Sequence, residues 1–324
     1  MGRLGESDGK FVIIISLALT GVQNLLGLLR IHYFCAVLKL QKIKRKDLDV
    51  DKYSKALNDA LNYRIYAEHW YLDILTEEKW ECLVFGDYEV IMPIPLQYKF
   101  GIKFVLQPIY CQQLGVFYKE EISEELFLEF EKKLHKYRVR AYHFNEENTE
   151  RFSPEGEIRT NFVLDLNRPY EEIYKGFSKS TKWNLKQFVK SGEIVERRYD
   201  SDELIDFKTL NSATPFSETY LTKLLNGLHS KEALDCFNID SEKELVAFGA
   251  FIKSENRIIY INSAANEEGK KIGAPTGILN EIIKTYAGQN LLLDFEGSTI
   301  PQLNYFFKGF GGTPNDYTYF SNFK

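Results

Sequence analysis

The first half of the chain alternates between apolar runs and amphipathic segments in a pattern that predicts a mixed α/β lobe. Two apolar runs flank the turn residues Gly86 and Asp87 and predict a pair of antiparallel strands. Ser123 precedes apolar residues at helical spacing, as expected for a capped amphipathic helix. A polar stretch at 145–160 ends the lobe. The predicted elements are helical turns at 51–71, strands at 80–85, 88–96, 103–108 and 113–117, a helix after Ser123 and a strand at 140–145.

The second half continues this alternation and predicts a second lobe of strands and helices. Pro169 opens a helix at its first turn, where the missing N–H costs nothing. The predicted elements are a strand at 161–166, helices from Pro169 and at 178–189, a strand at 193–199, helices at 201–210 and 217–228, antiparallel strands at 244–253 and 257–264, a helix at 276–287, a strand at 291–295, a short helix at 300–307 and a strand at 317–320.

The composition is that of a soluble globular protein and narrows the classes of function. Of the 324 residues, 44% are hydrophobic and 27% are charged, and the net charge of -5 gives no overall attraction for nucleic acid or anionic lipid. The four cysteines form no CxxC pair, and the five histidines lack the spacing of a zinc site. We therefore expect no metal, although a site built on carboxylates alone stays open. Unpaired thiols indicate a cytoplasmic protein.

Residues 11–29 form an uncharged hydrophobic stretch close to the length that spans a bilayer. Basic residues follow between Arg30 and Lys46, and the positive-inside rule would keep the rest of the chain in the cytoplasm. The bulky residues 31–34 argue against a cleaved signal peptide. Two interpretations of residues 1–46 remain. They are either a membrane anchor, which would place the protein at the inner face of the membrane, or the product of translation begun upstream of the true start.

A glycine-containing segment at 264–277 separates a predicted strand from a predicted helix. Unpaired N–H groups at a helix start, together with the helix dipole, bind phosphate or pyrophosphate, and glycine lets such a ligand approach the backbone. Two lysines add positive charge. An ordinary glycine-containing loop is the alternative. The candidate ligand-binding residues are Lys270, Lys271, Gly273, Ala274, Thr276 and Gly277.

The segment 291–311 contains the candidates for catalysis. Asp294 and Glu296 follow a run of leucines, and alternation along a strand would place both on one face. Glu296 suits a general base toward an amine if partial burial raises its pKa, whereas capping a helix or binding backbone amides is the alternative. Lys308 precedes a glycine turn and would stabilise a developing oxyanion, unless it is simply solvated.

Two groups in the first lobe and one basic helix are candidates for substrate contact. Gln112 and Gln113 lie beside an aromatic strand end, while Trp70 and Tyr71 lie on one crowded helix. Each pair suits the wall of an acceptor cleft, and each also suits core packing. The helix at 178–189 carries lysines around a tryptophan, which suits an anionic substrate, a phosphate backbone, a lipid surface or plain solvent.

Several segments together resemble the FemAB-like branch of the GNAT superfamily. These are the strand at 162–166, the helix start at 176–184 and the ending LLLDFEGS…FFKGFGG. The first lobe, with YAEHWYLDI and CQQLGVF, looks like the N-terminal partner lobe of bacterial FemAB-like proteins. The resemblance extends from about Leu48 to the C-terminus. It implies tandem GNAT-like lobes and transfer of an acyl group to an amine.

The resemblance also implies donors and residue roles. In GNAT enzymes a Gln/Arg-x-x-Gly-x-Gly/Ala loop binds the pyrophosphate of acyl-CoA, and the nearest match here is 270–275. There, Lys270 replaces Gln/Arg, and Pro275 replaces the final small residue and removes an N–H. Fem peptidyltransferases use aminoacyl-tRNA instead, and a C-terminal Phe-Lys pair associated with transfer matches Phe307 and Lys308. We find no long helical-hairpin insertion of the kind that some Fem enzymes carry.

The sequence thus predicts an α/β (α+β) fold of two tandem GNAT-like lobes, each a mixed, mostly antiparallel sheet flanked by helices. The predicted regions are an N-terminal extension at 1–46, a first lobe at 47–158 and a second, acyltransferase lobe at 159–324.

The expected function is N-acyl transfer from acyl-CoA to an amine of a small molecule or cell-wall precursor. Glu296 would act as the base beside Asp294, and Lys308 would stabilise the oxyanion. Phe307 and the first-lobe candidates would contact the substrate. The alternatives are aminoacyl transfer from tRNA to a cell-wall precursor, or a non-catalytic ligand-binding protein of the same fold.

Overall fold

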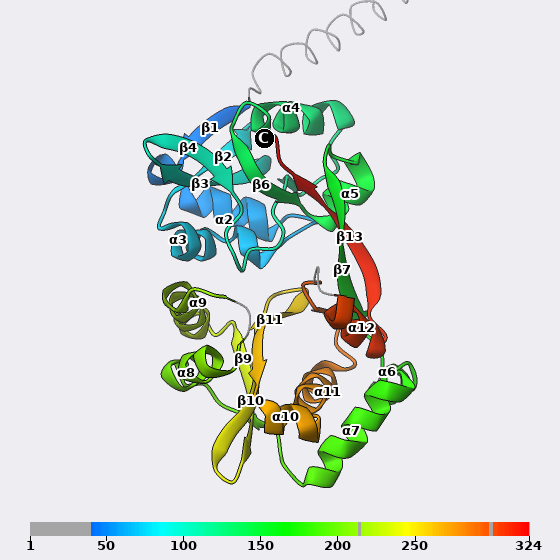
Figure 1. Cartoon of the computed structure of the whole chain (residues 1–324). Helices are drawn as coiled ribbons and strands as arrows, with labels where there is room; N and C mark the ends of the chain where they lie inside the picture. The colour runs from blue at the N-terminus through cyan, green and yellow to red at the C-terminus, as the bar shows by residue number, and fades with distance from the viewer. Residues whose placement is uncertain (1–39, 213–214, 298–300, 324) are drawn as a thin grey trace, which may run out of the picture.

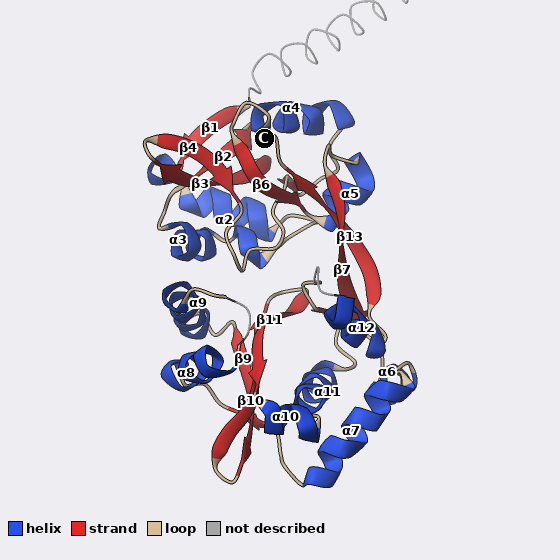
Figure 2. Cartoon of the chain, viewed as in Figure 1, coloured by secondary structure: helices blue, strands red, loops and turns tan. Residues whose placement is uncertain are grey.

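The computed structural model describes residues 40–212, 215–297 and 301–323, which form two lobes stacked end to end (Figure 1). In each lobe helices pack beside the strands of a sheet (Figure 2), which confirms the predicted fold class. The first lobe contains β1 (Gln41–Lys44), the short 3-10 helix η1 (Arg45–Asp47), α2 (Val50–Asn58), η2 (Ile65–Ala67), α3 (His69–Thr76), β2 (Trp80–Phe85), β3 (Val90–Lys99), β4 (Ile102–Leu106), β5 (Phe117–Tyr118), α4 (Glu124–Leu134), β6 (Val139–Phe144) and α5 (Glu146–Phe152).

The second half of the chain supplies the remaining elements. These are β7 (Glu157–Asp165), α6 (Tyr170–Lys175), α7 (Lys179–Ser191), β8 (Glu196–Arg197), α8 (Ser201–Asn211), α9 (Glu218–Ser230), β9 (Leu234–Ser241), β10 (Glu244–Lys253), β11 (Arg257–Ala265), α10 (Glu267–Ile272), α11 (Ala274–Tyr286), β12 (Leu292–Asp294), α12 (Pro301–Gly309) and β13 (Thr313–Phe320).

The described strands form one mixed sheet that runs through both lobes. Its order is β1-β2-β3-β4-β6-β13-β7-β12-β11-β10-β9-β8, with β5 paired to β3. The two halves of this order repeat one scheme. In the first lobe β2, β3 and β4 are antiparallel and β4 pairs parallel with β6. In the second lobe β9, β10 and β11 are antiparallel and β11 pairs parallel with β12.

In each repeat, the strand that follows the parallel pair along the chain lies in the sheet of the other lobe. β7 follows the first lobe in sequence but pairs with β12, whereas the C-terminal β13 pairs with β6. β7 and β13 also pair with each other, from Thr313↔Val163 to Tyr319↔Glu157. Figure 1 shows them as the green and red strands that connect the lobes. The boundary that we predict at 158/159 falls inside β7.

The described residues form two apolar cores, of which the first is shared by both lobes. The first fills the first lobe and continues onto one face of the second lobe's sheet, where α8 and α9 cover it. The second lies on the opposite face, against α6, α7, α11 and α12. At Gly227 of α9 an added Cβ would lie 2.3 Å from Ile74 Cδ1 of α3, so these two helices pack closely across the lobe boundary. The lobes therefore share a core.

Local signals explain where several helices begin. The side chains of Ser123, Ser178 and Ser217 accept hydrogen bonds from the backbone N–H three residues later, at 3.3, 3.1 and 3.4 Å. A helix starts at Pro169 as predicted, but the proline is the N-cap residue of α6 and lies one position before the first turn, where we predict it.

The segment at 264–277, which we predict as a loop, instead contains α10. Asn266 starts this helix, because its Oδ1 accepts a hydrogen bond from the Gly269 amide at 2.8 Å. The polar stretch at 145–160 likewise contains α5 and the start of β7, and Asn145 caps α5 through the Asn148 amide at 2.9 Å. An asparagine at these positions starts a helix, and the sequence prediction took it for a loop residue.

The predicted membrane anchor at 11–29 lies outside the described residues. Within the described ranges, no helix is long and apolar enough to cross a membrane. Cys82, Cys111 and Cys236 are buried and unpaired.

Candidate active site

The parallel pair β11–β12 separates early and leaves an opening in the sheet. The strands pair only as far as Ile259↔Asp294, whereas β11 continues to Ala265. From Tyr260 onward, this edge of β11 has no strand partner among the described residues. An unpaired strand edge presents N–H and C=O groups, so it can bind the amide groups of an extended ligand.

A cavity of about 510 Å³ lies at this opening and has walls from both lobes. The second lobe provides the unpaired part of β11, Lys208 of α8, and aromatic rings that include Phe295 and Phe307. The first lobe provides Ile109 and Tyr110. Largely apolar walls with a few polar groups are typical of a small-molecule site.

Glu296 supplies the carboxyl of the described cavity wall. Its backbone is left-handed, with φ 57°, and Gly297 follows with φ 53°. A Cβ at Gly297 would lie 2.5 Å from the Thr160 carbonyl oxygen, so only glycine fits there. Such a conformation costs a non-glycine residue about 1–3 kcal/mol, and the surrounding contacts must hold it. One of these is the Glu296 amide, which donates to Asp294 Oδ1 at 2.8 Å.

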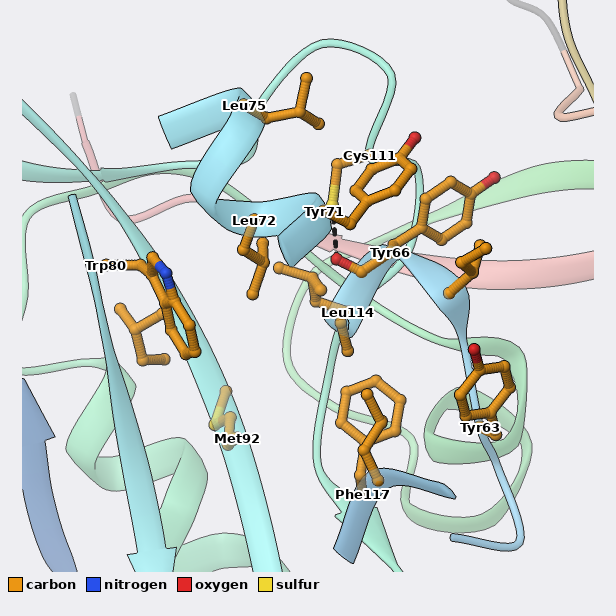
Figure 3. Packing of buried hydrophobic residues seen from close by; sticks show 14 of the residues in the cluster. Tyr63, Tyr66, Tyr71, Leu72, Leu75, Trp80, Met92, Cys111, Leu114 and Phe117 are labelled. Atoms are coloured by element: carbon orange, nitrogen blue, oxygen red, sulfur yellow. Dashed lines mark hydrogen bonds between the residues drawn. The ribbon is translucent and has the colours of Figure 1, made fainter. Parts of the chain in front are cut away.

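Two first-lobe side chains hold Glu296 from the other side. The Tyr66 hydroxyl donates to the Glu296 carboxylate, and the Gln112 side-chain amide donates to the Glu296 backbone carbonyl. Tyr66 belongs to the first core, where its ring lies beside that of Tyr71 with centroids 5.8 Å apart (Figure 3). The first lobe thus positions a carboxyl of the second lobe.

The surroundings of Glu296 change its acidity. Burial raises the pKa of Glu296 to about 8; the hydrogen bond from Tyr66 opposes this shift, and the Asp294 carboxylate adds to it. A carboxyl with a pKa near the working pH is suited to general base catalysis.

A buried ionic network joins the lobes directly behind Glu296. Arg257 of the second lobe binds Glu146 of the first at 2.5 Å and Asp294 at 2.7 Å, and Arg64 binds Glu146 at 2.6 Å. Asn161 donates to both carboxylates, at 3.1 and 2.9 Å. Burial alone would raise the pKa of Glu146, but Arg64 and Arg257 hold it at about 2. The network therefore stays charged and fixes how the lobes meet.

Solved structures of other proteins have the same architecture as this chain. FemX matches with a TM-score of 0.60 and 9% identity, over 86% of this chain and 96% of that one. An acetyltransferase from the GNAT family of Colwellia psychrerythraea matches with a TM-score of 0.53 and 13% identity, over 88% and 100% of the two chains. L-PGS from Bacillus licheniformis matches with a TM-score of 0.50 and 14% identity, over 84% and 91%. The chain has a FemAB-like GNAT fold.

The sequence prediction of a FemAB-like GNAT fold is therefore confirmed. No protein-family model matches the sequence, and no curated protein matches it either.

Within the FemAB-like fold, strand alternation is not what brings the two predicted catalytic carboxylates together. β12 ends at Asp294, and the left-handed turn at Glu296 places the two side by side. Asp294 binds Arg257, Asn161 and the Glu296 amide. Asp294 thus holds the backbone of Glu296 and is not part of the described cavity lining.

The first-lobe candidates lie behind the cavity wall. Gln113 is fully buried and donates to Glu146 Oε1 at 3.2 Å. The Tyr71 hydroxyl donates to the Tyr110 carbonyl, and Trp70 packs edge-on against Tyr71 with centroids 5.7 Å apart. The described lining of the cavity includes none of these side chains, nor that of Gln112. Tyr71 and Gln112 support the lining residues Tyr110 and Glu296, whereas Gln113 belongs to the ionic network.

The predicted phosphate-binding segment forms the junction of α10 and α11. Gly273 has φ 80°, and a Cβ there would lie 2.7 Å from the Asn184 carbonyl oxygen of α7, so the junction packs tightly on α7. The amides of Thr276 and Gly277 already donate to the Gly273 carbonyl at 3.0 and 3.1 Å, and Pro275 has no N–H. The start of α11 therefore offers few free amides to an anion.

The other donor candidates divide between core and surface. Ala274 is fully buried, whereas Lys271 is exposed. Lys270 is also exposed, and its ammonium pairs with Glu267 at 2.7 Å. Pro275 lines the cavity. The segment thus borders the cavity through its proline.

The Phe-Lys pair of α12 is split between cavity and surface. Phe307 lines the cavity and stacks on Phe295 with centroids 4.9 Å apart. Lys308 is exposed, and its Nζ lies 5.3 Å from the centroid of the Phe162 ring. The structure therefore brings Glu296 and Phe307 to one cavity and leaves Lys308 beside it.

Sequence reasoning missed Lys208, Glu146 and Arg257. Lys208 follows the buried Leu204 by four residues and the buried Ile205 by three, so it lies on the apolar face of α8. A lysine at such a position could have been recognised in the sequence. Arg257, similarly, is a charged residue at the start of a buried apolar strand. Among the described residues, no group of three or more His, Cys, Asp or Glu is arranged to hold a metal ion.

Proposed function

We propose that this chain is an N-acyltransferase that moves an acyl group from acyl-CoA to an amine bound between the lobes. The observation that carries the proposal is the position of Glu296, a carboxyl with a raised pKa in the wall of an interlobe cavity, at the opening of the β11 edge. The fold supports it, since one similar structure is an acetyltransferase of the GNAT family.

The chemistry follows from this placement. The Glu296 carboxylate takes a proton from the amine as the nitrogen attacks the thioester carbonyl carbon. The N–C bond forms, the C–S bond breaks, and the carboxyl returns the proton to the leaving thiolate. Phe307 packs beside the reacting groups. Lys308 is retained as the group that stabilises the oxyanion, which requires its side chain to turn from the Phe162 ring into the cavity.

The donor would lie along the unpaired edge of β11. The pantetheine arm of CoA carries two amide groups, which suit hydrogen bonds to a strand edge. Its phosphates would then reach the surface near Lys270 and Lys271, past Pro275 and the start of α11. Because few amides are free there, these lysines would carry most of the contact with the phosphates.

A second candidate function is aminoacyl transfer from tRNA to a cell-wall precursor or lipid. A groove of about 650 Å³ beside α7 is lined by Lys179, Lys182, Lys186 and Lys284 together with Trp183, and its described lining holds no carboxylate. Lysines interleaved with an exposed aromatic ring suit a single-stranded nucleic-acid end. FemX and L-PGS share this fold, and this similarity supports the second candidate.

Release of free thiol from a panel of acyl-CoA thioesters in the presence of many amines tests the proposal. The proposal predicts thiol release that depends on the amine. A parallel arm offers aminoacyl-tRNA, and transfer from tRNA alone would replace the first candidate by the second. No transfer in either arm, together with thermal stabilisation by a ligand, would leave a non-catalytic binding protein.

A further inference from the structure

Lys208 is a buried lysine in the cavity wall. Its side chain extends from α8, and the residue is only 8% exposed. Its Nζ contacts the Ser263 carbonyl oxygen at 3.2 Å and lies 5.1 Å from the centroid of the Phe216 ring. Burial lowers the pKa of Lys208.

The other buried basic residues of the described chain have carboxylate partners. Arg64 binds Glu146 and Glu147, and Arg257 binds Glu146 and Asp294. Within the described ranges no carboxylate pairs with Lys208. A buried ammonium without a counter-ion is costly unless a ligand supplies one.

The same cavity holds complementary groups for a molecule that carries both charges. Lys208 is the basic residue of the described lining and Glu296 is its carboxyl. Asn262, also in the wall, has a buried Oδ1 without a hydrogen-bond partner among the described residues. A cation, an anion and a spare acceptor around one cavity match a ligand with a carboxylate and an amine.

We propose that the acceptor is a free amino acid, whose carboxylate binds Lys208 Nζ while its amine faces Glu296. This assignment rests on the proposed N-acyl transfer. Lys208 then determines specificity, since a site built to pair with a carboxylate discriminates against an amine that lacks one.

The test compares amines that differ only in the carboxylate. Each ω-amino acid from β-alanine to 6-aminohexanoate is paired with the alkylamine of equal chain length, and α-amino acids are paired with their amides. The wild type should show a KM at least tenfold lower for one or more of the amino acids than for the matched amine. In Lys208→Met, which keeps most of the side-chain length and removes the charge, the ratio of KM values between each amino acid and its matched amine should approach one. Lys223→Met, an exposed lysine on α9, is the control and should behave as wild type.

A binding measurement separates failure of this inference from failure of the proposed function. The preferred amino acid should raise the Tm of the wild type and of Lys223→Met, but not that of Lys208→Met. Equal acylation of amino acids and alkylamines would overturn the assignment and leave N-acyl transfer standing. Stabilisation by amino acids that depends on Lys208, without any acyl transfer, would overturn the function and keep the carboxylate site. Neither transfer nor stabilisation would overturn both.

Discussion

At the scale of single residues, the site depends on a carboxyl whose ionisation is set by groups from both lobes. Glu296 belongs to the second lobe, but Tyr66 and Gln112 of the first lobe hold it. A left-handed backbone is strained for a glutamate, and burial makes its ionised form costly. Strained backbones and shifted pKa values concentrate at functional sites.

Replacing this carboxyl should remove catalysis and its pH dependence. Glu296→Gln is expected to lower kcat/KM by about 10²–10⁴-fold. With an alkoxyamine acceptor, which stays unprotonated near neutral pH, the wild-type rate should rise with pH, reach half of its maximum near pH 8 and level off above it, because Glu296 must lose its proton to act as a base. The measurement is kcat/KM against pH for both proteins. A wild-type profile without this rise would contradict the role of Glu296.

Glu296 should also make the stability depend on pH. The free energy of unfolding should fall with rising pH, whereas the catalytic rate rises. Its pKa is raised from 4.5 to about 8, so between these values the folded state binds a proton that the unfolded state releases. The free energy of unfolding therefore falls as pH rises through this window, by up to about 1.4 kcal/mol per pH unit. His143, whose pKa burial lowers to about 4, has the opposite effect below pH 6.5, but it is common to both proteins.

The measurement is the difference in free energy of unfolding between wild type and Glu296→Gln, by urea titration at several pH values. From about pH 5 to 8, the wild type should lose stability relative to the variant. A difference that stays constant over this range would exclude a raised pKa of Glu296.

The role of a single residue could be predicted where neighbours in sequence indicate it, and not where distant partners determine it. Glu296 and Phe307 lie within the C-terminal segment that resembles FemAB-like proteins, and both line the cavity. Lys208 and Arg257 did not stand out, because their importance comes from partners distant in sequence. The binding of Arg257 to Glu146, 111 positions away, is visible only after the lobes assemble.

At the scale of elements, caps and apolar spacing predicted most helices, whereas a strand that contains buried polar residues was missed. β9 was missed because Asp235 and Asn238 interrupt its apolar run. Both are buried. Asp235 binds Arg197 and Tyr286, and the Asn238 side-chain amide donates to the Arg198 carbonyl at 3.1 Å, although its Oδ1 has no hydrogen-bond partner among the described residues. A strand whose polar groups have tertiary partners does not show a strand pattern in its sequence.

The junction of α10 and α11 should tolerate only glycine, and α7 offers a matched control. Gly273 and Gly192 end helices with φ 80° and 81°, but an added Cβ would lie 2.7 Å from the Asn184 carbonyl oxygen at Gly273 and would meet nothing within 4 Å at Gly192. Gly192→Ala should therefore cost about 1–2 kcal/mol for the left-handed backbone alone. Gly273→Ala should cost roughly 1–3 kcal/mol more because of the clash. Urea denaturation measures both, and equal losses would show that the junction has room.

At the scale of the whole molecule, the ionic network and the shared core make the two lobes one unit. Element order predicted two lobes, and the similar structures bear out the fold. The exchange of β7 and β13 was not predictable, because a strand's sequence records which face is buried and not which strand lies beside it. The position of the cavity follows from this assembly, so it could not be placed from the sequence either.

Breaking the network should destabilise the whole molecule. Arg257→Met leaves the buried Glu146 and Asp294 with one cation fewer and is expected to cost about 3–5 kcal/mol. Arg151→Met removes a surface pair with Glu121, at 3.1 Å, and should cost about 1 kcal/mol or less. The free energies of unfolding by urea, followed by fluorescence, test the comparison. Similar losses for the two variants would mean that the network does not hold the lobes.

The exchanged strands also constrain how the protein is made. β13 is translated after every other described strand, yet it pairs with β6 of the lobe that is translated first. Until β13 emerges from the ribosome, the edge of β6 that it covers lacks this partner, and a nascent chain with an exposed edge is open to wrong pairing. Folding during translation therefore cannot proceed to completion one lobe at a time. The first lobe can mature only after β13 has emerged, and the cavity between the lobes forms only with the second lobe in place.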